Sequence, residues 1–429
     1  MQRRETSASS GPVPSPRISV TLRVISQEYN PVVADTNEAV LVAWGRTPVG
    51  RFLGALSDLA APDLAASLVR HLVSVLDLKP EEVDEVILGT VVQAGQGQNP
   101  ARQAALRGGL PPTVSAFTVN KVCGSGLKAV HLAAQTVRLG EARVVLAGGM
   151  ESMSQAPFLL QGVRRGQKLG HGQMKDALVH DGLWCAFEDW HMGSAADHTA
   201  RTFDITREAQ DRFAAESHRR AVAARESGVF KDEIVPVNAA RAGKPPQIVY
   251  KDEGPRADVS PESLARLSPA FGKDGTVTAG NASQLSDGAA LVAVCDEATA
   301  RKRGWPIRAR IRSVAVAGVP PKEIFRAPVP AVRLVLERAG WSLDQVDALE
   351  LNEAFSAQVL ANHKELGWNP ERANQRGGAV ALGHPIGASG ARVLVTLGRI
   401  LEDTKGRRGL AGACLGGGNA IMMAIERDA

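Results

Sequence analysis

The alternation of apolar and polar positions along this chain predicts strands and helices in turn. An apolar run at 39–42 predicts a strand, and apolar residues then recur at helical spacing over 63–76 and as a strand-like run over 83–92. A further helix predicted at 124–140 leads to a strand at 142–149. Strand, helix and strand in this order predict a parallel sheet that is covered by helices, a fold of the α/β class.

The C-terminal part of the chain repeats this plan. VDALELNEAF (346–355) has the pattern of the strand at 83–92, and GASGARVLVTLGRIL (387–401) followed by GLAGACLGGG (409–418) resembles the later helix and strand of the first part. The spacing between these elements is about 40 residues in both parts, which is more than one βαβ step needs. We therefore predict an internal duplication, with coincidence between two ordinary βαβ segments as the alternative.

The pattern divides the chain into four parts. Residues 1–36 contain clustered serines and several prolines but no apolar core of a secretory signal, so we expect a disordered leader or a mis-called start. Residues 37–155 are the predicted N-terminal half, which 275–305 complete, and 306–429 are the C-terminal half. Between them, residues 156–274 are rich in Gly, Lys, Arg and Pro and are predicted to form an inserted loop domain.

Composition and charge narrow the class of protein. The 429 residues are 44% hydrophobic, and no stretch is apolar for the roughly 18 residues that a membrane span needs, so no membrane is expected. The net charge of +5 comes from residues scattered along the chain, which mildly favours an anionic ligand. The sequence has no basic patch with interspersed aromatic residues, so nucleic acid is not an expected ligand. Four widely spaced cysteines lack the spacing of a zinc site or a secreted disulfide framework, so we expect a cytoplasmic protein without a metal ion.

Cys123 lies where a reactive thiolate would be expected. It is followed by Gly124, Ser125 and Gly126 at the start of a predicted helix. Small residues let other groups approach the sulfur, and the start of a helix would aim free N–H groups at it. The alternative is a buried structural cysteine at a tight turn, which is the commoner case for a lone cysteine.

His384 stands in the loop of the second half that corresponds to the surroundings of Cys123. Equivalent loops of duplicated halves can face each other across a pseudo-twofold axis, so Cys123 and His384 are predicted to share one pocket. A histidine close to such a cysteine is the usual way to generate a thiolate near neutral pH. The alternative is a histidine that only hydrogen-bonds across its own turn.

A second thiol, Cys414, ends an apolar strand and is followed by three glycines, Gly416–Gly418. Glycines permit close approach of a ligand and leave N–H groups free to bind a developing oxyanion, although a tight turn after a core strand is the simpler interpretation. Together with the Asn352-Glu353 pair, two thiols and one histidine suit carbon–carbon chemistry at a thioester: one thiol accepts an acyl group and the other exchanges a proton with a carbon acid.

These motifs occur in a consistent order from about residue 38 to 426: NKVCGSGLKAV, AGGMESMSQAP, HMG, GTVTAGNAS, SDGAA, NEAF, GGAVALGHPIGASGAR and CLGGGNA. As an ordered set they resemble the thiolases, and specifically the acetyl-CoA acetyltransferase branch of that family. The resemblance implies a thiolase fold, in which two βαβ halves form five αβαβα layers with an inserted loop domain. It also implies a homotetramer built as a dimer of dimers.

The resemblance further implies a role for each catalytic residue. Cys123 would be the acyl-accepting nucleophile, activated by His384, and Cys414 would exchange a proton with the α carbon of acetyl-CoA. His384 and a water held by Asn352 would form one oxyanion hole. The backbone N–H groups of Cys123 and Gly416 would form the other.

Coenzyme A would lie mainly against the loop domain, as a substrate and not as a cofactor. The residues that the resemblance implies along its path or at the thioester end are Leu183, His191, Met192, Arg256, Ser263, Phe271, Ser283 and Phe355. A packed histidine is the alternative for His191, and a solvated surface charge is the alternative for Arg256. No metal ligands are indicated.

Some stretches depart from the acetoacetyl-specific pattern. IFRAP (324–328) stands where Met-Gly-x-Gly-Pro is common, Arg376 stands where many relatives have Asn, and SQLSDGAA (283–290) is typical of fatty-acid-degrading relatives. Phe325 in place of glycine would shrink or reshape the acyl pocket.

The leading prediction is an acetyl-CoA C-acetyltransferase, which condenses two acetyl-CoA molecules to acetoacetyl-CoA and CoA, or cleaves that product, through an acyl-cysteine. The alternatives are a 3-ketoacyl-CoA thiolase of fatty-acid β-oxidation with broader chain length and, more remotely, a non-catalytic thiolase-like protein that binds acyl-CoA or lipid.

Overall fold

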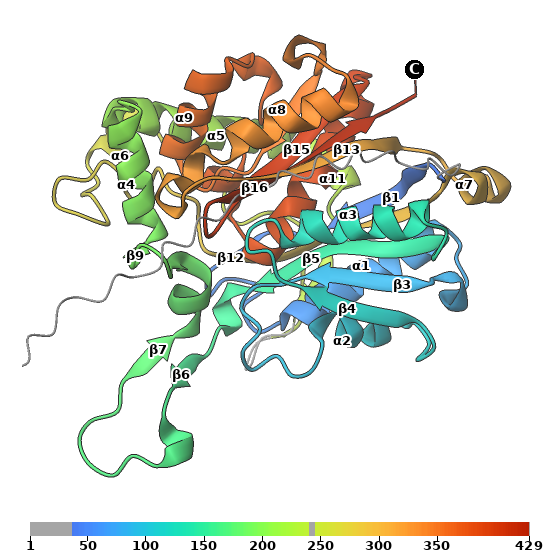
Figure 1. Cartoon of the computed structure of the whole chain (residues 1–429), viewed down its shortest axis with the longest axis horizontal. Coiled ribbons are helices and arrows are strands. Elements are labelled where there is room, and N and C mark those ends of the chain that lie inside the picture. The colour runs from blue at the N-terminus through green and yellow to red at the C-terminus, as the bar shows by residue number, and fades with distance from the viewer. Residues whose placement is uncertain (1–36, 240–244, 429) are drawn as a thin grey trace, which may run out of the picture. The chain divides into compact units, whose positions relative to one another are not determined.

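The computed structural model describes residues 37–239 and 245–428, so the predicted leader at 1–36 lies outside the described residues. The centre of the fold is a ten-stranded sheet made of two sets of strands (Figure 1). The N-terminal set runs in the order β1 (Ala39–Arg46), β12 (Ser286–Asp296), β5 (Val144–Ser152), β3 (Glu85–Gly89) and β4 (Ser115–Val119), with β2 (Gly50–Arg51) paired to β12. The C-terminal set runs in the order β13 (Ala309–Gly318), β16 (Asn419–Glu426), β15 (Arg408–Leu415) and β14 (Ala348–Leu351).

The two sets repeat the same pairings. In the first, β1 pairs antiparallel with β12, β12 antiparallel with β5, and β5 parallel with β3. In the second, β13 pairs antiparallel with β16, β16 antiparallel with β15, and β15 parallel with β14. A short antiparallel contact of β1 with β13, at Val40 and Leu41, joins the sets. The shared order and direction of strands confirm the predicted internal duplication.

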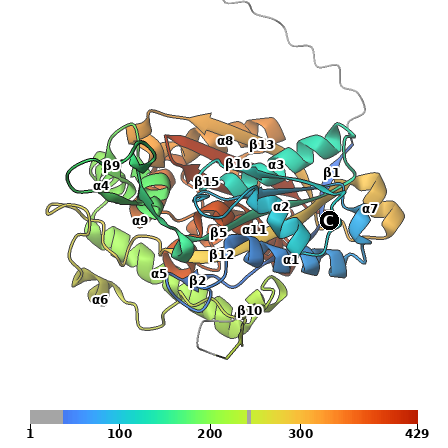
Figure 2. The ribbon, with the colours of Figure 1, turned by 90° about the horizontal axis from the view of Figure 1, so that it is seen from below.

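Helices complete the layers around the two sets of strands. Helix α3 (Ser125–Arg138) packs on α11 (Ile386–Thr404) between the sets, and α8 (Pro328–Ala339) covers the C-terminal set (Figure 2). Helices α1 (Ala61–Val75) and α2 (Pro100–Arg107) cover the N-terminal set. Three apolar cores fill the spaces between layers: one surrounds the central helices α3 and α11, one lies under α1 and α2, and one lies under α8. This arrangement confirms the expected five layers.

Glycines allow the two central helices to approach closely. A Cβ on Gly126 of α3 would lie 3.0 Å from the backbone of Ala391, and one on Gly390 of α11 would lie 2.8 Å from the backbone of Leu127. Both distances are too short for a side chain. The approach matters for the site because Cys123 precedes α3 and His384 precedes α11.

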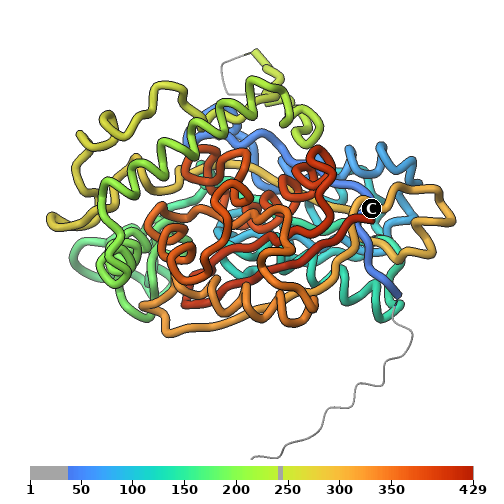
Figure 3. Tube along the Cα trace, turned by 90° about the horizontal axis from the view of Figure 1, so that it is seen from above, coloured from blue at the N-terminus to red at the C-terminus, as the bar shows by residue number. Residues whose placement is uncertain are grey.

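In the described part of residues 156–274, the predicted loop domain, there are short strands and three α-helices. The strands are β6 (Phe158–Leu160), β7 (Met174–Asp176), β8 (Trp184–Cys185), β9 (Trp190–His191), β10 (Val237–Ala239) and β11 (Gln247–Val249). The helices are α4 (Met192–Thr202), α5 (Arg207–Ser227) and α6 (Pro261–Ala265). In Figure 3 the green-to-yellow segment that contains α5 runs beside the orange and red C-terminal helices, and α5 packs on α9 (Ser356–Leu366) and α10 (Ala379–Leu382).

Helix α5 forms from the stretch TREAQDRFAAESHRRAVAARESG, residues 206–228. Thr206 caps its N-terminus by accepting the N–H of Ala209, and Gly228 ends it in a left-handed conformation at φ +80°. The remaining helix, α7 (Glu297–Arg303), follows β12. Within residues 37–239 and 245–428, no helix has the length and apolar character that crossing a membrane requires.

Candidate active site

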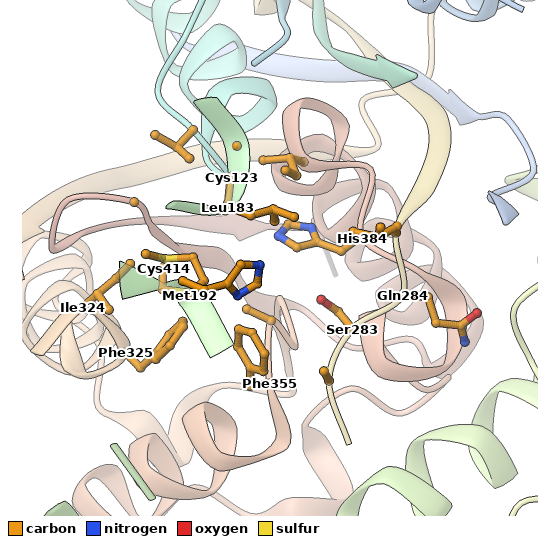
Figure 4. Close-up of a pocket in the computed structure, with 18 of the residues that line it drawn as sticks. Cys123, Leu183, Met192, Ser283, Gln284, Ile324, Phe325, Phe355, His384 and Cys414 are labelled. Carbon is orange, nitrogen blue, oxygen red and sulfur yellow. The ribbon is translucent and has the colours of Figure 1, made fainter. Parts of the chain in front are cut away.

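One cavity of about 450 Å³ lies where the two halves meet the loop domain (Figure 4). It is lined by four of the five predicted catalytic residues: Cys123, His384, Cys414 and Gly416. It is also lined by six of the eight predicted substrate residues: Leu183, His191, Met192, Phe271, Ser283 and Phe355. Residues that are far apart in the sequence are therefore brought together as the duplication predicted.

Backbone conformation holds Cys123 at this cavity. The preceding residue, Val122, is in the left-handed region at φ +48°, which costs a β-branched residue about 1–3 kcal/mol. Ser125 fixes the turn: its Oγ accepts the N–H of Lys121 at 2.8 Å and donates to the carbonyl of Val122 at 2.6 Å. A Cβ on Gly124 would lie 2.3 Å from Leu415 Cδ2, so a larger residue would require that side chain to shift.

The Cys123 sulfur carries its proton in this structure. Burial raises the pKa of the thiol to about 12, although the N–H groups of Cys123 itself and of Gly416 point at the sulfur and lower it. Burial therefore opposes the predicted thiolate in the substrate-free site, because it outweighs both donors, and a thiolate at Cys123 near neutral pH stays a prediction. The same two N–H groups were predicted to form an oxyanion hole, and they lie side by side at the sulfur.

His384 is arranged as a neutral base. Its Nδ1 lies 2.6 Å from Ser389 Oγ, and the single hydrogen of that hydroxyl goes to the carbonyl of Pro385 at 2.9 Å. Nδ1 must then carry the ring hydrogen, which leaves a lone pair on Nε2. Asn352 Nδ2 lies 3.4 Å from Nε2. Burial, with the charge of Arg392, lowers the pKa of His384 to about 3.

Asn352 lies at the end of β14, outside the lining of the cavity but in contact with His384. Its N–H donates to the carbonyl of Gly412 at 2.9 Å, which anchors it to β15. The side chain is fully buried, and its Oδ1 accepts no hydrogen bond from the described part of the chain. A buried carbonyl oxygen without a partner suits a bound water, the role that the resemblance implies.

Glu353 joins the strand that carries Asn352 to the loop that carries His384. Its carboxylate accepts from Ser217 Oγ at 2.7 Å, from Asn374 Nδ2 at 2.9 Å and from the N–H of Val380 at 3.2 Å. Three donors satisfy a buried carboxylate and make the loop rigid. The sequence singled out Glu353 beside Asn352, and the structure gives this acid a positioning role.

Cys414 lies in β15 opposite Ala420 of β16 and is almost fully buried. Burial, and then the neighbouring Cys123, raise the pKa of its thiol well above the ordinary value. Both thiols are therefore neutral before a substrate binds. The influence of Cys123 on this pKa also means that the two sulfurs are close.

Aromatic rings line the side of the cavity away from Cys123. His191 Nδ1 caps α4 by accepting the N–H of Gly193 at 3.0 Å, and its ring stacks on Phe271 at 4.7 Å. His191 is thus both a packed histidine and a lining residue. Phe355 contacts Phe271 and Phe325 edge-on, with ring centroids 6.4 Å and 5.3 Å apart.

Two of the predicted substrate residues do not line the cavity. The N–H of Arg256 donates to His218 Nδ1 at 3.2 Å, and its side chain borders a separate hollow beside α5. Ser263 forms a capping box with Ser260 at the start of α6, which uses its hydroxyl locally. Contacts of these two residues with coenzyme A stay a prediction.

Glu151 is a site residue that the sequence reasoning did not identify. Its buried carboxylate accepts from the N–H groups of Val91 at 3.0 Å, Val92 at 3.2 Å and Gly387 at 2.8 Å, and from Thr90 Oγ1 at 2.9 Å. It therefore ties the N-terminal half to the start of α11. An acid within the apolar run AGGMES was the available signal.

Proteins of similar sequence and structure carry names that agree with the resemblance inferred from the motifs. A Pseudomonas aeruginosa protein named "Acetyl-CoA acetyltransferase" is 52% identical over 391 residues, which are 91% of this chain and 100% of that protein. A Staphylococcus aureus (strain COL) "Probable acetyl-CoA acyltransferase" is 52% identical over 90% of this chain and 98% of its own length. The crystal structure of the Bacillus anthracis acetyl-CoA acetyltransferase superposes with a TM-score of 0.89 at 43% identity, covering 91% of this chain and 99% of that one.

The family match covers nearly all of the described residues. Residues 39–298 match the family described as "Thiolase, N-terminal domain", and residues 305–427 match "Thiolase, C-terminal domain". The resemblance read from the motifs and the fold that it implied are both confirmed. The chain belongs to the thiolase family of acyltransferases.

Proposed function

We propose that this chain is an acetyl-CoA C-acetyltransferase that interconverts two acetyl-CoA molecules with acetoacetyl-CoA and CoA. The observation that carries the proposal is the meeting of two neutral thiols and a neutral histidine in one cavity, with the lone pair of His384 Nε2 unprotonated. This protonation pattern is the one required at the start of thiolytic cleavage. Coenzyme A is then a substrate, and the chemistry needs no resident cofactor.

Cleavage begins with acyl transfer to Cys123. His384 Nε2 takes the thiol proton as the sulfur attacks the ketone carbon of acetoacetyl-CoA, and the bond between C2 and C3 then breaks. The oxyanion that forms at the attacked carbon accepts from the N–H groups of Cys123 and Gly416, which already point at the sulfur. The products of this step are acetyl-Cys123 and the enolate of acetyl-CoA.

The Cys414 thiol gives its proton to this enolate, whose oxygen is bound by His384 and by a water held at Oδ1 of Asn352. Free CoA then returns a proton to Cys414 and attacks acetyl-Cys123. When the second acetyl-CoA leaves, His384 returns its proton to Cys123. Every group ends in its initial protonation state, and condensation is the reverse sequence.

A short acyl group is supported by the position of Phe325. Its side chain is almost fully buried, and it lies edge-on to Phe355 on the cavity wall, next to Ile324. An aromatic ring where glycine is common occupies volume that several methylenes would need.

The test compares CoA-dependent cleavage of acetoacetyl-CoA with cleavage of a medium-chain 3-ketoacyl-CoA by the purified protein. We expect a higher kcat/KM for acetoacetyl-CoA. Phe325→Ala should raise activity on the longer ester, and Phe230→Ala, a buried aromatic outside the cavity, is the matched control. Equal cleavage of both esters by the unaltered protein would assign it to the fatty-acid-degrading branch instead.

The proposal extends to a cytoplasmic homotetramer. Its support is the hairpin of β6 and β7, which projects from the fold in Figure 1. This segment exposes the side chains of Phe158, Leu160, Val163, Leu169 and Met174. Exposed apolar patches of this kind mark sites of association. Light scattering on the purified protein should give the mass of four chains, and Phe158→Glu should reduce that mass.

A further inference from the structure

A cluster of buried charges lies behind the contact between Asn352 and His384. Its members are three arginines and four carboxylates, all at most 7% exposed: Arg46, Arg376, Arg392, Glu233, Asp252, Glu350 and Glu353. They act on one another electrostatically across β1, β14, α11 and the insert. Buried charges are expensive unless they are paired and hydrogen-bonded, so the way each one is satisfied is informative.

One part of the cluster is bonded directly. Arg46 donates to Glu233 at 2.6 Å and forks onto Asp252 at 2.7 Å and 2.9 Å. Glu233 also accepts from Thr396 Oγ1 at 3.2 Å. These distances are those of charge-assisted hydrogen bonds.

The other part is not bonded directly. Arg392 Nη1 lies 3.7 Å from Glu350 Oε2, and Arg376 Nη1 lies 3.8 Å from Glu233 Oε2, both too long for hydrogen bonds. Within the described part of the chain, both oxygens of Glu350 and both terminal nitrogens of Arg392 lack a hydrogen-bond partner, as do Arg376 Nη1 and Glu233 Oε2. Six buried polar atoms that each need a partner, four of them in two pairs just beyond hydrogen-bond distance, suit enclosed water, because a buried water typically makes two to four polar contacts.

The Glu350–Arg392 pair joins the two elements that hold the oxyanion site. Glu350 lies in β14, and Asn352 follows two positions later, directly after the end of that strand, where its N–H is bonded to Gly412 of β15. Arg392 follows Ser389 by three positions in α11, on the same side of the helix, and Ser389 holds the ring of His384. The pair therefore connects β14 to α11 directly behind the 3.4 Å contact of Asn352 with His384.

We propose that Glu350 and Arg392, bridged by enclosed water, are positioning residues that set the separation of Asn352 and His384. Neither lines the cavity, so neither touches the substrate. The charge of Arg392 also helps to keep His384 neutral. The inference rests on the proposed function, because it concerns the oxyanion site of that reaction.

Arg376 belongs to the same cluster of buried charges. It pairs with Asp403 and faces Glu233, and it replaces an asparagine that the sequence pattern led us to expect. An arginine here adds positive charge to a cluster that otherwise has two arginines against four carboxylates. This departure from the family pattern thus has a structural account.

The first test is kinetic. Glu350→Gln keeps the shape of the side chain but replaces one carboxyl oxygen with an amide nitrogen that cannot ionise, and Arg392→Met removes the guanidinium. Both are expected to lower kcat for acetoacetyl-CoA cleavage by about 10- to 100-fold, with KM nearly unchanged, because a displacement of about 1 Å can cost 100-fold. Arg392→Met should also move the acid limb of the pH profile upward, since it removes a cause of the low pKa of His384.

The double variant Glu350→Gln/Arg392→Met distinguishes a positioning role from a general disturbance of the fold. Removing both partners leaves neither buried polar group without the other, so the loss of kcat in the double variant should be smaller than the product of the two single losses. Arg310→Met is the matched control. Arg310 lies at the start of β13, where it pairs with Glu297 and Asp428. The control variant should leave kcat within about twofold, as surface pairs contribute little.

Two results would overturn the inference. One is a Glu350→Gln variant that folds and has the same kcat and pH profile as the unaltered protein. If Arg392→Met does not fold, its kcat is replaced in the comparison by that of Arg392→Lys, which keeps the positive charge but lacks the two-pronged guanidinium. The other is a high-resolution crystal structure in which Glu350 and Arg392 touch without water between them. Failure of the unaltered protein to cleave any 3-ketoacyl-CoA would instead refute the proposed function.

Discussion

The two halves of the fold repeat one strand order but hold their catalytic groups by different means. The N-terminal half presents Cys123 through its backbone, with Val122 in a left-handed conformation and Ser125 closing the turn. The C-terminal half presents His384 and Asn352 through side-chain hydrogen bonds and buried charges. A nucleophile needs a fixed place with N–H donors around it, which a backbone turn supplies. A base needs a defined tautomer and charge, which only neighbouring side chains set.

The largest effect is expected from removing the Cys123 thiol, the catalytic group that the backbone of the N-terminal half holds in place. Cys123→Ser is expected to lower acetoacetyl-CoA cleavage at least about a thousandfold, since an alcohol of high pKa replaces the nucleophile. The measurement is the loss of the 3-ketoacyl thioester absorbance, together with detection of the acetylated protein by mass spectrometry.

Cys295→Ala is the control for Cys123→Ser, because Cys295 lies in β12 away from the cavity. It should retain activity and still become acetylated. Acetylation of Cys123→Ser at the normal rate would remove Cys123 from the mechanism and with it the stated division between the halves.

A smaller effect is expected from the side-chain contacts of the other half. Ser389→Ala removes the acceptor of the His384 Nδ1 hydrogen, so the ring is free to turn and to adopt the other tautomer. We expect kcat to fall about tenfold, the size of one buried hydrogen-bond partner lost. KM should change little, because Ser389 does not line the cavity.

Ser356→Ala is a matched control for Ser389→Ala, since Ser356 is equally buried at the start of α9 but does not contact His384. It should leave kcat unchanged. A normal kcat for Ser389→Ala would mean that the tautomer of His384 is fixed by other contacts.

The difference between the halves also explains what the sequence could predict. The strand and helix order, the duplication, and the meeting of Cys123 with His384 followed from periodicity, repeated patterns and ordered motifs. Local patterns do not report burial, which is why the sequence did not indicate the raised pKa of the Cys123 thiol. They also did not reveal that Glu151 collects four donors or that Glu350 and Glu353, three positions apart, are satisfied so differently. Such partners come from distant segments that only the fold brings together.

The smallest expected effect concerns stability and comes from Glu350. Burial raises the pKa of this carboxyl from 4.5 to about 8, with Glu353 and Glu233 also raising it and Arg392 and Arg376 lowering it. Between these two values the folded protein keeps a proton that the unfolded chain has released. The free energy of unfolding should therefore fall as the pH rises from about 5 to about 8.

Glu350→Gln cannot ionise, so urea unfolding at several pH values should show a flatter dependence of the free energy of unfolding on pH for this variant. Glu353→Gln is not an equivalent change, because it replaces one of the two oxygens that accept from three donors with an amide nitrogen, and it should destabilise the fold at every pH. An unchanged pH dependence in Glu350→Gln would show that Glu350 is ionised throughout, held by Arg392 as an ordinary ion pair.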